Sequence, residues 1–286
     1  MTVGVCVTTR HRHELLLACL THIEQSSLLP LHVVVSDDSS KPGEIAKTKE
    51  VVGRFPRAVY VEGPHRGVCA NRNNALEHIG EVDHVAFLDD DALVTPDYFA
   101  RAQAVFDAAP AERRGRLIVS GVRIDLEGRR TVPVKLGFRG YFVETRPTRV
   151  AGASYAVYPR SFFNAHLWDE QIYFGYEDAE LSLRALTDGF EIVHSDEMVL
   201  TDAGRDQSTL LSEGGSVDAY NFNGEAARLY VGVKRYKEIE RSLPKLALFV
   251  PTYFAQVTYS LAKRGSLRRL PQLVKLSNVA SLFKRA

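Results

Sequence analysis

The sequence is poor in cysteine, and it has no long apolar run of the kind that crosses a membrane. Its three cysteines, Cys6, Cys19 and Cys69, form no CxxC pair, which argues against a disulfide scaffold and favours a reducing compartment. The most membrane-like stretch, residues 246–262, is interrupted by a proline and a glutamine and is shorter than the roughly 20 apolar residues of a spanning helix. No signal peptide is visible, so we expect a cytoplasmic protein.

Acidic residues are absent from the C-terminal part of the chain. From Arg241 onward there are nine Lys and Arg residues and no Asp or Glu, which leaves 27 basic against 35 acidic residues, a net charge of −8, before that position. We therefore predict a domain over residues 1–240 and a basic, partly apolar helical extension over residues 241–286. This extension either packs on the domain or makes peripheral contact with anionic lipids at the inner face of a membrane. Nucleic acid is not an expected partner, because the body is acidic and no recognised motif appears.

Short β-rich runs alternate with helical stretches through the first half of the chain. Strands are expected at residues 3–9, 31–40, 58–63 and 84–91, and helices at residues 13–26, 41–54, 68–80 and from the Thr95-Pro96-Asp97 start onward. A further helix is expected from Tyr176 to Gly189. This rhythm predicts an α/β fold with a mostly parallel central sheet and helices on both faces.

Polar loops follow three of the expected strands. The loops read TTRHR, SDDSS and LDDDA. In parallel sheets, ligands bind beyond the carboxyl ends of the strands. The sequence therefore predicts that these loops form one binding site.

Three adjacent aspartates, Asp89, Asp90 and Asp91, end the expected fourth strand, in VAFLDDDALVTPDYF. They form either a solvated turn or a site for a hard divalent cation, Mg²⁺ or Mn²⁺, which takes carboxylate and phosphate oxygens as ligands. In extended backbone Asp89 and Asp91 face one side while Asp90 points elsewhere. One acid would then hold the metal ion and its neighbour a ribose.

In order along the chain, a first strand ending in Thr, then VVVSDDSS, RGVCANRNNAL, the Asp-x-Asp and FGYEDAELSLRALTDGF resemble the family 2 glycosyltransferases with the GT-A fold. The resemblance covers residues 3–202. It implies a Rossmann-like nucleotide-sugar-binding half over residues 1–95 and an acceptor half over residues 96–240. The donor would be a nucleotide-diphospho sugar of the UDP, GDP or dTDP type. The acceptor would be a saccharide, a lipid-linked compound or another hydroxyl compound, in polysaccharide, glycolipid or other glycoconjugate biosynthesis.

The resemblance also implies roles for individual residues. The residues that would bind the nucleotide sugar are Thr8, Arg10, Asp38, Arg72 and Asp90. The residues that would bind the metal ion are Asp89 and Asp91, with Asp202 as an alternative ligand where many relatives have a histidine. Turn chemistry explains Asp38 equally well, and Arg72 has the alternative of an exposed helix arginine.

Asp178 is implied as the catalytic base, although an aspartate at a helix start also caps free N–H groups. One base acting in one displacement at the anomeric carbon inverts its configuration. The acceptor is expected near Gly152, Trp168 and Glu177. Trp168 is either a stacking surface for a sugar or part of the local core.

Two other functions compete with this one. A sugar nucleotidyltransferase would usually carry a glycine-rich phosphate loop after its first strand, whereas TTRHRHELL has no glycine. A non-catalytic nucleotide- or sugar-binding module would not need Asp178.

Overall fold

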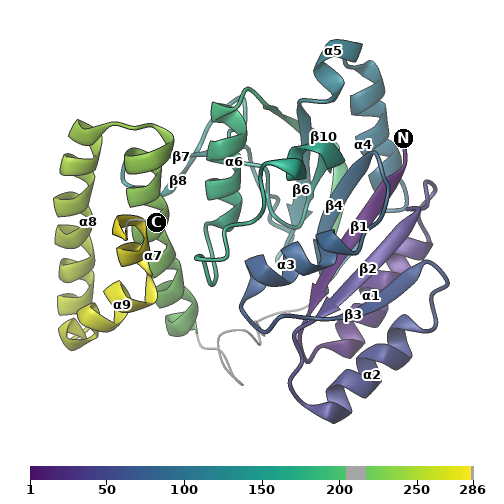
Figure 1. The fold of residues 1–286 in the computed structure, drawn as a ribbon, viewed down its shortest axis with the longest axis horizontal. Helices are drawn as coiled ribbons and strands as arrows, with labels where there is room; N and C mark the ends of the chain where they lie inside the picture. The colour runs from purple at the N-terminus through teal and green to yellow at the C-terminus, as the bar shows by residue number, and fades with distance from the viewer. Residues whose placement is uncertain (204–216, 285–286) are drawn as a thin grey trace.

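A computed structural model of the chain describes residues 1–203 and 217–284, built around one sheet of eight strands (Figure 1). The strands are β1 (Val3–Thr9), β2 (His32–Asp37), β3 (Ala58–Glu62), β4 (His84–Asp89), β5 (Ala92–Val94), β6 (Leu117–Ile124), β9 (Ala156–Pro159) and β10 (Glu191–Asp202). Their order is β3-β2-β1-β4-β9-β6-β10-β5. The first four strands run parallel, β9 is antiparallel to both its neighbours, and β10 runs parallel to β6. The predicted α/β fold with a mostly parallel sheet is confirmed.

Helices cover both faces of this sheet, because side chains along each strand point alternately to opposite faces. In β1, Val5 and Val7 belong to one buried cluster, together with α1 (His13–Glu24) and α4 (Tyr98–Ala108). Cys6, between them, belongs to the other cluster, together with α3 (Val68–Glu77) and α6 (Glu177–Thr187). The remaining helices of this part are α2 (Pro42–Val52), α5 (Ala111–Arg114) and the short η1 (Arg160–Asn164).

The C-terminal part adds a helical layer beside α6 (Figure 1). Its helices are α7 (Val217–Lys234), η2 (Arg235–Ile239), α8 (Leu243–Lys263), η3 (Leu267–Arg269), α9 (Leu270–Leu276) and η4 (Val279–Phe283). A two-stranded hairpin of β7 (Val134–Leu136) and β8 (Phe142–Glu144) is attached to this layer, where Arg228 of α7 donates to the carbonyl of Arg139 at 2.6 Å. The domain boundary predicted at residue 240 stays a prediction, and Arg285 of the basic tail lies outside the described residues.

Most of the expected elements occur within a few residues of their expected positions. The exceptions begin after the acidic run, where the short strand β5 was not expected. The next helix begins at Tyr98 rather than at Thr95, whose hydroxyl bonds to Asp97 at 3.0 Å instead of capping the helix. The long strand β10, which extends to Asp202, was not expected at this length either.

All three cysteines are buried free thiols, which agrees with the expected absence of a disulfide framework. Among the residues that the structure describes, none of the helices combines the length and apolarity needed to cross a membrane.

Candidate active site

The carboxyl ends of β1, β2 and β4 lie side by side. Thr8 of β1 is in register with Ser36 of β2 on one side and with Asp89 of β4 on the other. The loops that follow these strands therefore meet at one edge of the sheet, as the sequence predicted. Thr8 itself is buried in the sheet.

Asp38 and Arg10 lie at the ends of β2 and β1. Oδ1 of Asp38 accepts the backbone N–H of His65 at 2.9 Å, and burial raises the pKa of Asp38 while the nearby charges of His65 and Arg10 lower it. A Cβ atom on Gly63 would lie 2.1 Å from the same Oδ1, so the chain passes this carboxylate too closely for any other residue. Because the charge of Arg10 acts on Asp38, these two expected nucleotide-binding residues are close neighbours.

The three aspartates occupy the tight turn between β4 and β5, and their side chains differ in direction. Asp90 points inward and is 4% exposed; it accepts Thr9 Oγ1 at 2.7 Å and pairs with Arg12 Nη1 at 2.8 Å. Asp89 and Asp91 are more open, with side chains 38% and 23% exposed. Asp89 and Asp91 are therefore the two aspartates whose carboxylates are accessible to a ligand.

Asp202 lies beside Asp91 because β10 extends along β5. Asp202 is in register with Ala92, and the N–H of Ala203 donates to the carbonyl of Asp91 at 2.8 Å. Both carboxylate oxygens of Asp202 accept from Arg123 of β6, at 2.7 and 2.6 Å. Asp202 thus lies beside the turn that carries Asp89 and Asp91, the other two acids that the sequence proposed as metal ligands.

Burial and mutual repulsion shift the pKa values of these acids. Burial raises the pKa of Asp90 to about 7, and the charge of Asp91 adds to this rise although Arg12 opposes it. The pKa of Asp91 is also raised, by burial and by the charges of Asp89 and Asp202. Burial acts on Asp89 in the same direction, but the adjacent Arg72 outweighs it, so that its pKa is lowered.

Asp178 lies in the first turn of α6, after a strained loop. Gly175 and Tyr176 have φ values of 86° and 64°, and the second is a left-handed conformation that residues other than glycine rarely adopt. Oδ1 of Asp178 accepts the N–H of Ala179 at 2.7 Å. Burial and the negative charge of Glu177 raise the pKa of Asp178 to about 7. The carboxylate is therefore held in place and has the pKa of a group that can accept a proton near neutral pH.

Arg72 connects the two acidic groups. Its guanidinium donates to Asp89 Oδ1 and to Glu177 Oε1, both at 3.0 Å, and lies 4.9 Å from the centre of the Trp168 ring. Arg72 is only 3% exposed. It is thus a buried clamp between the strand end of β4 and the first turn of α6, rather than an exposed helix arginine.

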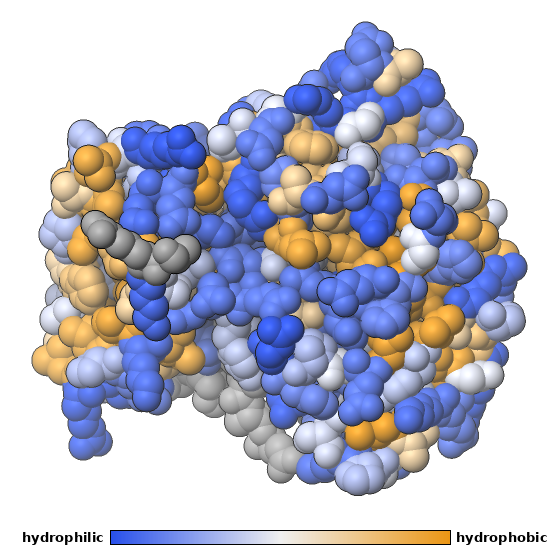
Figure 2. All heavy atoms as spheres, viewed as in Figure 1, coloured by the Kyte–Doolittle hydropathy of each residue, from blue (hydrophilic) through white to orange (hydrophobic). Residues whose placement is uncertain are grey.

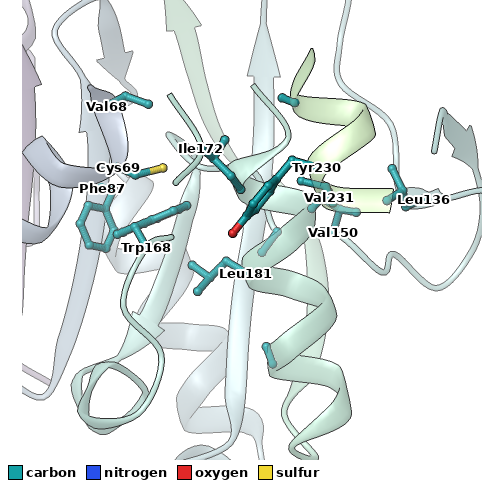
Figure 3. Packing of buried hydrophobic residues seen from close by; sticks show 14 of the residues in the cluster. Val68, Cys69, Phe87, Leu136, Val150, Trp168, Ile172, Leu181, Tyr230 and Val231 are labelled. Atoms are coloured by element: carbon teal, nitrogen blue, oxygen red, sulfur yellow. The ribbon is translucent and has the colours of Figure 1, made fainter. Parts of the chain in front are cut away.

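The three residues expected at the acceptor differ in their placement. Trp168 is 2% exposed and packs edge-on against Phe87 at 5.2 Å (Figure 3), so the expected stacking surface lies in the core. Gly152 is also buried, and a Cβ there would come within 1.9 Å of the ring of Tyr155. Glu177 is close to Asp178, and its Oε2 is buried with no hydrogen-bond partner among the described residues.

The donor atoms of this site fit a hard cation, although its carboxylates are engaged by arginines. Six acids, Asp89, Asp90, Asp91, Glu177, Asp178 and Asp202, lie around three arginines, Arg12, Arg72 and Arg123. When all are ionised, the acids outnumber the arginines by three. Within residues 1–203 and 217–284 no three His, Cys, Asp or Glu side chains are grouped so that they could hold a metal ion. Arg12 pairs with Asp91, and Arg123 pairs with Asp202.

Sequence reasoning missed Arg12 and Arg123. Arg12 stands in the TTRHR loop that was expected to contribute to the site, but Arg10 was chosen there. Arg123 carried no signal, because its role depends on the pairing of β6 with β10.

The chain resembles solved glycosyltransferase structures at low sequence identity. Residues 1–349 of TarS from S. aureus, in complex with UDP-GlcNAc, match with a TM-score of 0.62 and 18% identity, over 96% of this chain and 79% of that one. The mannosyltransferase PcManGT from Pyrobaculum calidifontis, in complex with GDP-Man and Mn²⁺, matches with a TM-score of 0.58 and 19% identity, over 99% and 76%. GalNAc-T7 with UDP, GalNAc and Mn²⁺ matches with a TM-score of 0.61 and 12% identity, over 95% and 58%. These likenesses show the GT-A fold.

A search of curated protein sequences gives no match. The sequence profile of glycosyl transferase family 2, in contrast, matches residues 4–167, more than half of the chain. This match includes the three strand ends, the triple aspartate and Arg72. The chain belongs to glycosyl transferase family 2 and is a glycosyltransferase with the GT-A fold.

Proposed function

We propose that this enzyme transfers a sugar from a nucleotide-diphospho sugar to an acceptor hydroxyl with inversion at the anomeric carbon, assisted by Mg²⁺ or Mn²⁺. The product would be a polysaccharide, a glycolipid or another glycoconjugate. The structures of TarS with UDP-GlcNAc and of PcManGT with GDP-Man support this class of donor.

The position and pKa of Asp178 carry this proposal. Its carboxylate is fixed by the N–H of Ala179, and its pKa of about 7 makes it half-ionised near neutral pH. It would accept the proton of the acceptor hydroxyl as the oxygen attacks the anomeric carbon. A single displacement with one base inverts the configuration, since no covalent sugar–enzyme intermediate is formed.

The nucleotide would bind at the ends of β1 and β2, near Thr8, Arg10 and Asp38. The convergence of these strand ends on the triple aspartate supports this placement. Asp90 is buried against Thr9 and Arg12, so a contact with the ribose requires its carboxylate to turn outward. Arg72 would act through Asp89 and Glu177, which it holds in place.

Asp91, with Asp89 and Asp202, would hold the divalent cation. The donor chemistry and the excess of negative charge support this assignment. When bound, the cation neutralises the negative charge that develops on the departing diphosphate. To bind the cation, Asp91 would give up part of its contact with Arg12, and Asp202 would give up part of its contact with Arg123.

The acceptor would lie over the first turn of α6, beside Glu177, whose Oε2 is buried without a hydrogen-bond partner among the described residues. An aromatic surface is available beside this turn, because the ring of Phe142 stacks on Tyr176 at 5.0 Å and is itself 41% exposed. Such a ring suits the apolar face of a sugar. We therefore place the stacking surface at Phe142 rather than at Trp168.

The proposal is tested by screening UDP-, GDP- and dTDP-sugars with Mn²⁺ for release of the nucleoside diphosphate, followed by NMR of the product. We expect an α-linked donor to give a β-linked product. Asp178→Asn should lower the rate of transfer by about 10²–10⁴-fold, while the matched control Asp188→Asn, at the exposed end of the same helix, should not. A product that retains the donor configuration would contradict the single-displacement mechanism.

A further inference from the structure

Helix α8 is apolar on two opposite faces. Its inner face packs on α7 and η2 and buries Phe249, Tyr253, Val257 and Leu261, which recur every four residues. This packing agrees with one of the two readings of the basic tail. It does not explain why the opposite face of α8 is also apolar.

The outer face, here called the outer stripe, is also uncharged and is exposed along its whole length. It consists of Pro244, Leu248, Pro251, Ala255, Tyr259 and Ala262, spaced three or four residues apart. The side chains of Leu248 and Tyr259 are 59% and 72% exposed, and Leu243 at the helix start is 74% exposed. A surface helix normally carries charged or polar residues on its solvent face, so an apolar outer face indicates contact with an apolar medium or partner.

Basic residues frame the outer stripe mainly at its C-terminal end. Lys263, Arg264 and Arg268 follow this end in exposed positions, whereas Lys245, near the beginning of the stripe, pairs with Glu240 at 2.7 Å. No acidic residue occurs anywhere from Arg241 onward. Apolar surface is visible along the outer edge of the molecule at α8, with hydrophilic groups above and below it (Figure 2).

We propose that the outer stripe docks this enzyme on the surface of an anionic lipid bilayer, with α8 lying in the plane of the interface. Leucine and tyrosine side chains suit the boundary between head groups and acyl chains, and the flanking Lys and Arg residues attract anionic head groups. At 1.5 Å per residue, the 21 residues of α8 give a contact about 30 Å long. The helix lies on the membrane without crossing it, in agreement with its composition.

Charge favours a bilayer over a second copy of the chain. In a two-fold symmetric dimer the same patch faces itself, and no acid from Arg241 onward would neutralise the basic residues that follow each outer stripe. An anionic bilayer supplies opposite charge over the whole length of the stripe.

The proposal is tested by sedimentation of the full-length enzyme with vesicles. Binding is expected to vesicles of phosphatidylcholine and phosphatidylglycerol in equal parts, to be much weaker with phosphatidylcholine alone, and to decrease at high salt. Leu248→Glu should weaken binding at least about tenfold, since it puts a charge into the apolar contact. The matched control Leu31→Glu, at a site 47% exposed and outside α8, should bind as the wild type does.

A second variant tests the basic frame without changing the apolar contact. Replacing Lys263 and Arg268 by serine should weaken binding roughly twenty-fivefold, at about fivefold for each basic residue near an anionic surface. Because both side chains are exposed, the unfolding midpoint should be unchanged. Equal binding to neutral and anionic vesicles, or unchanged binding of Leu248→Glu, would overturn the proposal. So would a wild type that sediments as a dimer through the outer stripe and ignores vesicles.

Discussion

Replacing Asp178 by asparagine removes one negative charge and keeps the size of the side chain. The carbonyl oxygen of asparagine can still accept the N–H of Ala179, so the start of α6 should be preserved. A lost general base typically costs 10²–10⁴-fold in rate, and we expect transfer to fall by about this factor while donor binding is kept. In the wild type, the rate should rise with pH and level off above pH 7, because only ionised Asp178 accepts the proton.

The same substitution should stabilise the folded enzyme at high pH. The pKa of Asp178 is raised from 3.8 to about 7 in the folded state, so between these values the folded state binds a proton that the unfolded state has lost. The stability of the wild type therefore falls as the pH rises through this window. At 1.36 kcal/mol per pKa unit the whole effect is at most about 4 kcal/mol, and partial solvent screening reduces it to about 1–2 kcal/mol.

Urea unfolding at pH 5 and at pH 8 measures this difference. Asp178→Asn should exceed the wild type in free energy of unfolding at pH 8, and the gain should shrink at pH 5. The control Glu77→Gln, at an exposed site on α3, should show no such pH dependence. The reasoning fails if Asp178→Asn is less stable than the wild type at pH 8, or if it transfers sugar at the wild-type rate.

The arginines allow further predictions. Arg72→Met should reduce the free energy of unfolding by about 3–5 kcal/mol, because it leaves Asp89 and Glu177 without their buried partner; urea unfolding measures this loss, and a loss below about 1 kcal/mol would show that Arg72 is not a clamp. Arg12→Met should enlarge the rise in melting temperature caused by Mn²⁺, because it frees Asp91; a smaller rise than in the wild type would show that Arg12 does not compete with the cation.

The strand ends of the site could be predicted because they depend on local patterns. Buried parallel strands are continuous apolar runs, and each of VGVCVTT and HVAFLDDD ends abruptly in polar residues. Once these runs are parallel neighbours, their carboxyl ends must meet at one edge. The start of α6 was predictable for the same reason, since YEDAELSLRAL shows a helical period directly after the acids.

The partners of the acids could not be predicted, because they depend on long-range pairing. β10 is irregular between His194 and Val199, where its register with β6 shifts. Asp196 and Glu197 interrupt the apolar pattern there, so the sequence does not show that the strand continues. The part of β10 after this interruption brings Asp202 to Arg123 and Asp91. The sequence left both readings of Trp168 open for a similar reason, because its burial depends on Phe87, a residue 81 positions away.

The most direct test of the account is the metal dependence of nucleotide binding at the triple aspartate. Melting temperatures should be measured with UDP, GDP, dTDP and CDP, each with Mn²⁺ and with EDTA, for the wild type and for Asp91→Asn. A ligand at 100 times its dissociation constant stabilises the folded state by about 2.7 kcal/mol, which is a readily measured shift. We predict that one nucleotide raises the melting temperature of the wild type only with Mn²⁺, and that Asp91→Asn loses this response. No shift with any of the four nucleotides, or an undiminished shift in Asp91→Asn, would contradict the assignment of these acids to a cation and a diphosphate.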